Sequence, residues 1–253
     1  MTLTIQARLL EHLTPHAEGV AVADVRIGLG YTAIRLDSGH AGVAWTPTSD
    51  APCCTHFQGA GTLAGQPAGN LLSFLLDGKP GLARAIGMAT ANALLARLPH
   101  PPASREDVVS ILAVQPGERV AMVGYFGPVV TQLRKLGCRL DIVELRPRAG
   151  ETLGPDQGRE VLAACDVAIL TGTSLINGTA DDLLASLGRP RAAVLLGPSS
   201  PLCPAPFLGT KITHLAGARV READAVLRIV SEGGGTMLLK KHMDFETVPV
   251  GPA

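Results

Sequence analysis

Short apolar strands alternate with helical segments along the second half of the chain, and this alternation constrains the fold more than any other feature. The expected strands are 119–123, 139–143, 166–170 and 192–196, and the expected helices are 128–136, 158–164, 180–187 and 222–231. Short, largely apolar strands between helices are typical of a parallel sheet that is covered on both faces. The pattern predicts a Rossmann-like parallel sheet after about residue 104.

The first half predicts a smaller α+β unit. Its expected elements are an amphipathic N-terminal helix, antiparallel strands at 20–27, 31–36 and 42–46 with helices on one face, a Pro/Gly-rich loop at 47–69, and a helix at 83–98. Pro99-His-Pro-Pro102 ends that helix, because a helix does not continue through a run of prolines. Ser104 is expected to cap the next helix together with Asp107. We therefore expect two domains, 1–103 and 104–253, and an irregular tail from residue 233 onward.

The composition argues against two classes of partner. Basic and acidic residues balance at 22 each and aromatic residues make up only 3%, so neither a basic surface nor a base-stacking platform for nucleic acid is indicated. No apolar run approaches the roughly 20 residues of a membrane span. The five cysteines, with no recognisable export signal, are expected to be free thiols in a cytoplasmic protein. Homo-oligomerisation stays open.

The first two strand ends suggest a nucleotide-type ligand. In a parallel sheet, ligands bind beyond the C-terminal ends of the strands. Gly124 permits a tight turn, and Pro128 suits the first turn of a helix whose free N–H groups attract anions. Glu144 follows Gly124 by 20 residues, the offset at which dinucleotide-binding folds place an acid on a ribose hydroxyl. The alternatives are an ordinary strand–helix turn and a solvated glutamate paired with Arg146 or Arg148.

The third and fourth strand ends are rich in neutral polar groups. Thr171-Gly-Thr-Ser-Leu-Ile-Asn-Gly-Thr179 gathers hydroxyls and an amide that orient a ligand without a fixed charge. Gly197-Pro-Ser-Ser-Pro-Leu202 is a stiff loop that is expected to complete a pocket beside it. The alternatives are helix capping by Asn177 or Thr179 and a plain solvent loop. The candidate ligand-binding residues are Gly124, Tyr125, Phe126, Glu144, Thr171, Gly172, Thr173, Ser174, Asn177, Gly197, Pro198, Ser199 and, from the first domain, Tyr31.

A cluster of possible metal ligands stands apart from these motifs. Cys53, Cys54 and His56 bring two thiols and an imidazole together in the 47–69 loop. Soft metals favour such ligands. A structural zinc site would normally show a second, separated pair of ligands, and none follows in sequence. We therefore expect no tight structural zinc here, and these three residues are weak metal-ligand candidates.

The motifs together resemble the putative heavy-metal chelation domain family of prokaryotes. The resemblance rests on Val123-Gly-Tyr-Phe126, Glu144, the 171–179 and 196–202 segments, and Leu215-Ala-Gly217. The first half resembles the usual companion domain through Ile27-Gly-Leu-Gly-Tyr-Thr32, Gly39-His-Ala-Gly-Val-Ala44 and Gly87-Met-Ala-Thr-Ala-Asn-Ala93. The resemblance implies an enolase-N-terminal-like first domain, a Rossmann-like second domain and a site in the cleft between them.

Two functions follow as expectations. The first is binding of a small molecule, such as a metal chelator or its metal complex, in the interdomain cleft. The second is an enzyme that uses a nucleotide-type cofactor, either a dinucleotide or S-adenosylmethionine, at the strand ends. The sequence shows no G-x-S-x-G, P-loop or H-E-x-x-H motif. It therefore leaves open whether a reaction is catalysed.

Overall fold

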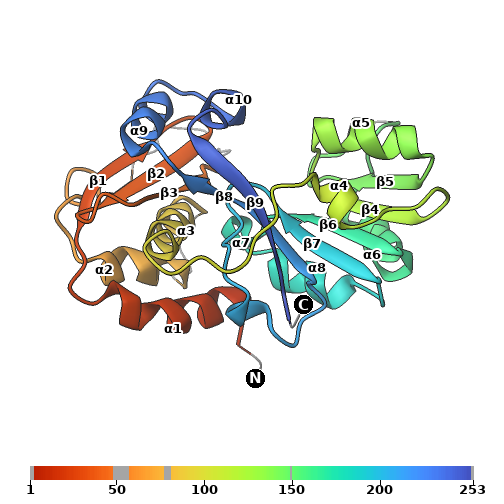
Figure 1. Ribbon diagram of the computed structural model, residues 1–253, viewed down its shortest axis with the longest axis horizontal. Helices are drawn as coiled ribbons and strands as arrows, with labels where there is room; N and C mark the ends of the chain where they lie inside the picture. The colour runs from red at the N-terminus through yellow and green to blue at the C-terminus, as the bar shows by residue number, and fades with distance from the viewer. Residues whose placement is uncertain (1–2, 48–56, 77–80, 149, 252–253) are drawn as a thin grey trace.

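The computed structural model describes residues 3–47, 57–76, 81–148 and 150–251, and it contains two separate sheets (Figure 1). The elements of the first half are α1 (Ile5–Ala17), β1 (Val22–Ile27), β2 (Tyr31–Leu36), β3 (Ala41–Trp45), α2 (Ala68–Leu72) and α3 (Gly81–Leu95). Those of the second half are α4 (Val108–Ile111), β4 (Arg119–Val123), α5 (Gly127–Leu136), β5 (Arg139–Val143), α6 (Pro155–Ala164), β6 (Val167–Thr171), α7 (Ser174–Asn177), α8 (Ala180–Ser186), β7 (Ala192–Leu196), β8 (His214–Val220), α9 (Ala223–Ser231), α10 (Thr236–Leu239) and β9 (Met243–Pro249). The predicted class, a mostly parallel C-terminal sheet preceded by a smaller α+β unit, is confirmed.

The large sheet has the strand order β5-β4-β6-β7-β8-β9. Its strands are parallel from β5 to β8, and β9 is antiparallel to β8. Side chains of α4 and α5 cover one face, whereas α6, α7 and α8 cover the other. The strand order reverses between β4 and β6, because the chain first moves outward to β5 and then returns past β4. In doubly wound sheets, this switch point is where ligands bind.

The small sheet has the order β1-β2-β3 and is antiparallel. Helix α3 lies against β3 so closely that a Cβ on Gly42 would come within 2.2 Å of the backbone nitrogen of Ala93. The alanine-rich sequence of α3 allows this approach, since small side chains let helix and strand backbones pack tightly. The contact fixes α3 on one face of the small sheet.

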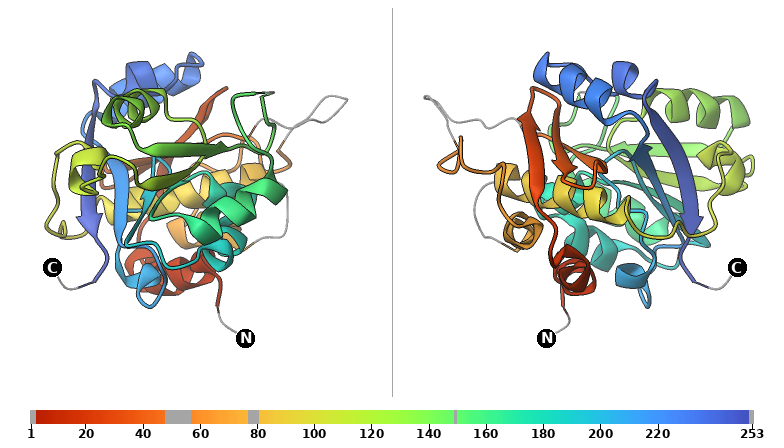
Figure 2. Two further views of the ribbon diagram at one scale, coloured as in Figure 1. Left: turned by 90° about the vertical axis from the view of Figure 1, so that its right-hand side faces the viewer. Right: turned by 60° about the vertical axis from the view of Figure 1, so that its left-hand side comes forward.

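The helices of the first half pack on one face of the small sheet, as expected, and the other face is covered by the C-terminal part of the chain (Figure 2, right). Val226, Leu227 and Val230 of α9 form a buried cluster with Tyr31, Ala33 and Val43 of the small sheet. The sequence pattern did not indicate that α9 packs on the small sheet, because we assumed that each half of the chain covers its own sheet.

Two sequence expectations were wrong. The tail is not irregular, since it contains α10 and β9, and β9 pairs along its whole length with β8. Ser104 does not cap a helix: its backbone pairs with that of Thr247 on β9. The cap of α4 is Asp107, whose Oδ1 accepts from Val109 N at 2.9 Å and Ser110 N at 3.4 Å. Both errors arose because strand pairing with a distant segment decided the local structure.

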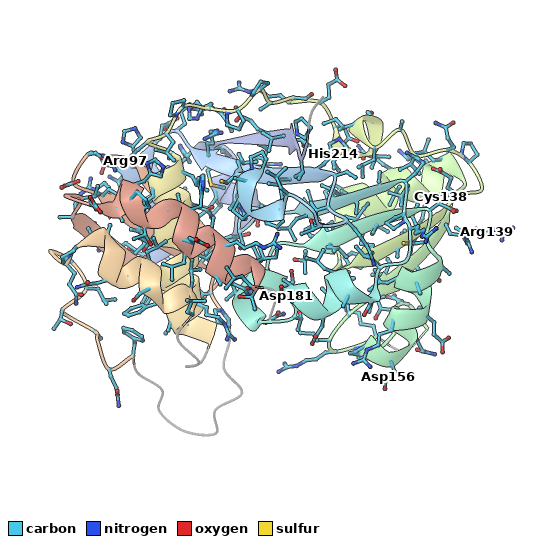
Figure 3. The ribbon with its side chains drawn as sticks, turned by 90° about the horizontal axis from the view of Figure 1, so that it is seen from below. Arg97, Cys138, Arg139, Asp156, Asp181 and His214 are labelled. Atoms are coloured by element: carbon cyan, nitrogen blue, oxygen red, sulfur yellow. The ribbon has the colours of Figure 1, made fainter. Side chains whose placement is uncertain are left out.

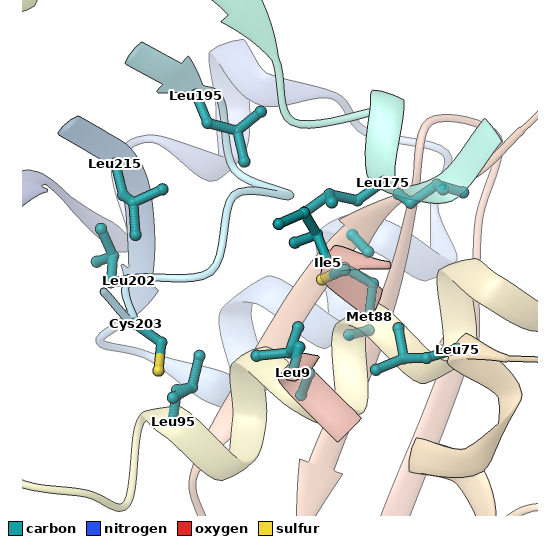
Figure 4. Close-up of a cluster of buried hydrophobic side chains, with 14 of the residues drawn as sticks. Ile5, Leu9, Leu75, Met88, Leu95, Leu175, Leu195, Leu202, Cys203 and Leu215 are labelled. Atoms are coloured by element: carbon teal, nitrogen blue, oxygen red, sulfur yellow. The ribbon is translucent and has the colours of Figure 1, made fainter. Parts of the chain in front are cut away.

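One hydrophobic cluster joins the two sheets (Figure 4). Ile5 and Leu9 of α1 and Met88 of α3 lie in the same cluster as Leu175 and Leu215 of the second half. A hydrogen bond crosses the same seam, where the backbone N–H of Ile5 in α1 donates to Oδ1 of Asp181 in α8 at 3.2 Å. Figure 3 shows Asp181 beside one end of α1. The division at residues 103 and 104 stays a prediction. Among the described residues, no helix is both long and apolar enough to cross a bilayer.

Candidate functional site

A cavity of about 340 Å³ opens at the C-terminal ends of β4, β5 and β6. It therefore lies at the switch point of the large sheet, the place where ligands bind in such folds. Its walls come from the strand ends, from helices α6, α7 and α8, and from the end of β3. The lining residues are Trp45, Val123, Gly124, Tyr125, Phe126, Val143, Glu144, Leu145, Pro155, Gly158, Arg159, Leu162, Thr171, Thr173, Asn177, Thr179, Asp182, Leu183 and Ser186.

Gly124 makes the tight turn that ends β4. Its φ is +92°, and a Cβ there would lie 3.0 Å from the Cβ of Thr171, so both the conformation and the space favour glycine. The ring of Phe126 lies near Gly124 and Gly197, within 3.5 and 3.7 Å of a Cβ built on each. Helix α5 then begins at Gly127 without a side-chain cap and with Pro128 in its first turn. These residues form the β4 side of the cavity.

Threonine hydroxyls and an amide form the β6 side. The Oγ1 atoms of Thr171 and Thr173 share a hydrogen bond of 3.0 Å. Asn177 Oδ1 accepts from the backbone N and the Oγ1 of Thr179, at 3.1 and 2.8 Å. Asn177 thus closes a turn onto Thr179, the residue before α8, but neither residue caps that helix, because α8 begins without a side-chain cap hydrogen bond. Asn177 also lines the cavity, and its amide nitrogen donates to no protein acceptor within the described ranges, so the turn does not use the whole side chain.

Charged side chains stand on the other walls and at the rim. Glu144 and Asp182 line the cavity with Arg159, so the walls carry both signs of charge. The guanidinium carbon of Arg148 lies 5.7 Å from the centroid of the Tyr125 ring, within the range of a cation–π contact. The ring of Tyr125 remains 42% exposed. Arg148 therefore places a cation beside Tyr125, whereas the walls of the cavity are mainly apolar.

The structure brings seven of the sequence candidates to this cavity and places the others elsewhere. Those that line it are Gly124, Tyr125, Phe126, Glu144, Thr171, Thr173 and Asn177. Gly172, Ser174, Gly197, Pro198 and Ser199 do not line it, and Ser174 and Ser199 are almost fully buried.

Tyr31 points away, and its hydroxyl shares a 2.7 Å hydrogen bond with Thr236 Oγ1 in the cluster beneath α9 and α10. Burial raises the pKa of this phenol. The side chain therefore stays neutral at physiological pH and serves packing at this position.

Sequence reasoning missed Trp45 and the helical walls. Trp45 is the only tryptophan of the chain and the last residue of β3, two residues before the Pro/Gly-rich segment that begins at residue 47. A lone tryptophan at a strand end beside such a segment is a signal that could have found it. The residues of α6 and α8, such as Arg159 and Asp182, carry no such signal, since they look like ordinary exposed helix positions.

The described residues offer no ready-made metal centre. Nowhere in the described ranges do three or more His, Cys, Asp or Glu side chains gather so as to hold an ion. Burial raises the pKa of the Cys203 thiol to about 11 and also raises that of Cys165. Both are poor ligands, because metals bind the thiolate. Cys53, Cys54 and His56 lie outside the described residues.

Fold and cavity together define the class: a mixed α/β protein with a ligand-sized cavity at the switch point of a parallel sheet. The chain belongs to the DUF364 family, described as "Putative heavy-metal chelation", whose model matches residues 107–249. A second model with the same description, DUF4213, matches residues 10–95. The family assignment confirms the resemblance drawn from the sequence motifs.

Known relatives match nearly the whole length of the chain. An uncharacterised protein of Methanocaldococcus jannaschii is 26% identical over 247 residues, covering 93% of each chain. A DUF364 protein of unknown function from Pyrococcus horikoshii has a similar structure, with a TM-score of 0.85, 23% identity, and coverage of 98% of this chain and all of that one. A third, from Desulfitobacterium hafniense, gives a TM-score of 0.78 at 21% identity, covering 95% and 98% of the two chains. At these identities, the structural likeness shows the fold alone.

Proposed function

We propose that the protein binds a small organic molecule, alone or as a metal complex, in the cavity at the ends of β4 and β6. The observation that carries this proposal is the cavity itself, which gathers residues from three strand ends, three helices and the small sheet. Its volume of about 340 Å³ falls within the range of small-molecule sites. Apolar walls with a few placed polar groups are the usual composition of such sites.

The lining favours an organic ligand over a bare ion. Trp45, Tyr125 and Phe126 are three of the eight aromatic residues of the chain, and all three line this one cavity. The rings of Trp45 and Phe126 bury apolar area and supply no donor atom for a metal, and Tyr125 supplies one phenol oxygen. The carboxylates of Glu144 and Asp182 are the only acidic groups among the described lining residues. A metal would therefore enter as the complex of an organic chelator, in keeping with the family description.

One arrangement favours the alternative, an enzyme with a nucleotide-type cofactor. Gly124 and Glu144 end neighbouring parallel strands and line the same cavity. In dinucleotide-binding sheets, the turn after the first strand receives a phosphate and the acid after the second receives a ribose hydroxyl. A dinucleotide or S-adenosylmethionine would then use Glu144 for its ribose and the start of α5 for its anionic end.

Native mass spectrometry of freshly purified protein, combined with metal analysis, tests the proposal. We expect a stoichiometric small-molecule adduct. An adduct that contains a metal supports a chelate, and a metal-free adduct with the absorbance of a nucleobase supports the alternative.

Two matched variants place the adduct. Ser186 lines the cavity from α8, so Ser186→Phe should fill it and abolish the adduct. Ala185 is the exposed neighbour outside the lining, so Ala185→Phe should retain it. An adduct that survives in the Ser186→Phe variant contradicts the proposed location. So does a protein that carries no adduct and binds neither nucleosides, S-adenosylmethionine, catecholates nor hydroxamates.

A further inference from the structure

Trp45 is the single contribution of the small sheet to the described lining of the cavity. Every other described lining residue follows residue 122 in the chain. The position of this one indole therefore depends on how the end of β3 is held against the large sheet.

Hydrogen bonds hold the end of β3 from two directions. From within the small sheet, Thr46 N donates to Gly30 O at 3.0 Å, and the hydroxyls of Thr46 and Thr32 share a bond of 2.9 Å. From the large sheet, Ser199 Oγ accepts from the backbone N–H of Trp45 at 2.9 Å. Ser199 follows β7, so this bond spans the seam between the two sheets.

Water is poorly placed to replace the serine. The side chain of Ser199 is 2% exposed, and the loop that carries it is stiffened by Pro198 and Pro201. The next residue, Ser200, is 1% exposed, and its Oγ has no hydrogen-bond partner in the structure. Of these two adjacent buried serines, only Ser199 therefore reaches β3.

We propose that Ser199 is a positioning residue that holds Trp45 in the cavity wall, and that Trp45 contacts the apolar face of the ligand. The part that concerns the ligand rests on the proposed function, whereas the part that concerns Trp45 does not. Ser199 thus acts on binding without lining the cavity itself. It also links ligand binding to the contact between the two sheets.

The intrinsic fluorescence of the chain tests the positioning, because Trp45 is its only tryptophan. In the full-length protein without ligand, Ser199→Ala should raise the acrylamide quenching constant of Trp45 and shift its emission. Ser199→Thr keeps a hydroxyl and should restore the wild-type quenching. Ser200→Ala is the matched control and should leave it unchanged, because its hydroxyl bonds nothing.

The second readout uses 1-anilinonaphthalene-8-sulfonate as a probe of the cavity. Energy transfer from Trp45 to this probe should be present in the wild type, and the affinity should fall about threefold to tenfold in Ser199→Ala, the effect of losing one hydrogen bond. Ser200→Ala should bind like the wild type.

The outcomes separate this inference from the proposed function. Wild-type quenching and affinity in Ser199→Ala overturn the positioning role, even if a natural adduct sits in the cavity. Absence of energy transfer in the wild type overturns the ligand contact of Trp45. A protein that shows altered quenching in Ser199→Ala but binds no natural ligand keeps the positioning role and loses the proposed function.

Discussion

The loops after β6 and β7 are alike in composition and opposite in use. Both follow parallel strands at the same sheet edge, and both are rich in Gly, Ser, Thr or Pro. Thr171 and Thr173 after β6 line the cavity, whereas Ser199 and Ser200 after β7 are buried. The second loop is wedged between two glycines: a Cβ on Gly172 would lie 2.4 Å from Ser200 Oγ, and one on Gly217 would lie 2.5 Å from Ser200 O.

The two loops differ in whether they contact the small sheet, and not in composition. This contact therefore decides which loop lines the cavity and which is buried. The β7 loop meets β3, where Ser199 bonds Trp45, and so becomes part of the seam. The β6 loop lies beside the switch point, where Thr171 and Thr173 line the cavity. Neutral polar residues at a strand end can therefore either hold a ligand or hold another segment of the same chain.

The largest expected effect is a loss of stability when the contact between Gly172 and the buried β7 loop is disrupted. Gly172→Ala places a methyl group 2.8 Å from the backbone nitrogen of Ser200, and such overpacking should reduce the free energy of unfolding by about 1–3 kcal/mol. Gly127→Ala is the control on the cavity side, where the nearest atom is 3.8 Å away. Its effect should stay within about 1 kcal/mol. Urea unfolding followed by circular dichroism measures both, and equal losses would refute the contrast.

A second substitution tests the role of Glu144 in the wall of the cavity. Glu144→Ala should weaken the ligand found by mass spectrometry by about 1–3 kcal/mol, because a buried polar partner on the ligand is left unpaired. Glu151→Ala, in the same loop but outside the lining, should bind normally. Isothermal titration calorimetry gives both affinities. Unchanged binding in Glu144→Ala, with an unchanged unfolding midpoint, would remove this carboxylate from the site.

The smallest effect concerns Tyr31, which the sequence placed in the site and the structure places under α10. Tyr31→Phe removes the bond to Thr236, whose side chain is exposed and can turn to water. The free energy of unfolding should fall by about 1 kcal/mol or less, and ligand affinity should not change. A clear loss of affinity with unchanged stability would show that the hydroxyl reaches the ligand.

Much of the fold was predictable, because strands β4 to β7 are short apolar runs that can be recognised from their own residues. Strands β8 and β9, and the packing of α9 on the small sheet, could not be predicted. Strand β9 buries Met243, Thr247 and Val248 without a two-residue alternation, and its partners are β8 and Ser104. Helix α9 buries Val226 against a sheet nearly 200 residues earlier in the chain. Such pairings depend on segments that lie far away in the sequence, and the residue pattern of one segment does not reveal them.

The candidate site divides in the same way. Gly124, Glu144 and Thr171 could be found because the rule for parallel sheets places all strand ends at one edge. Trp45 and Ser199 could not be assigned their roles, because the seam between the sheets decides them. The buried serines look the same in sequence as the threonines that line the cavity.

The most direct test of the account is amide NMR of the wild-type protein with a panel of nucleosides and chelators. The cavity at the switch point predicts that a binding compound perturbs the amides of Gly124, Gly127 and Thr173 most strongly, with a smaller change at Trp45. Perturbations centred on Tyr31 and Thr236, or spread without a centre while the compound binds stoichiometrically, would contradict it.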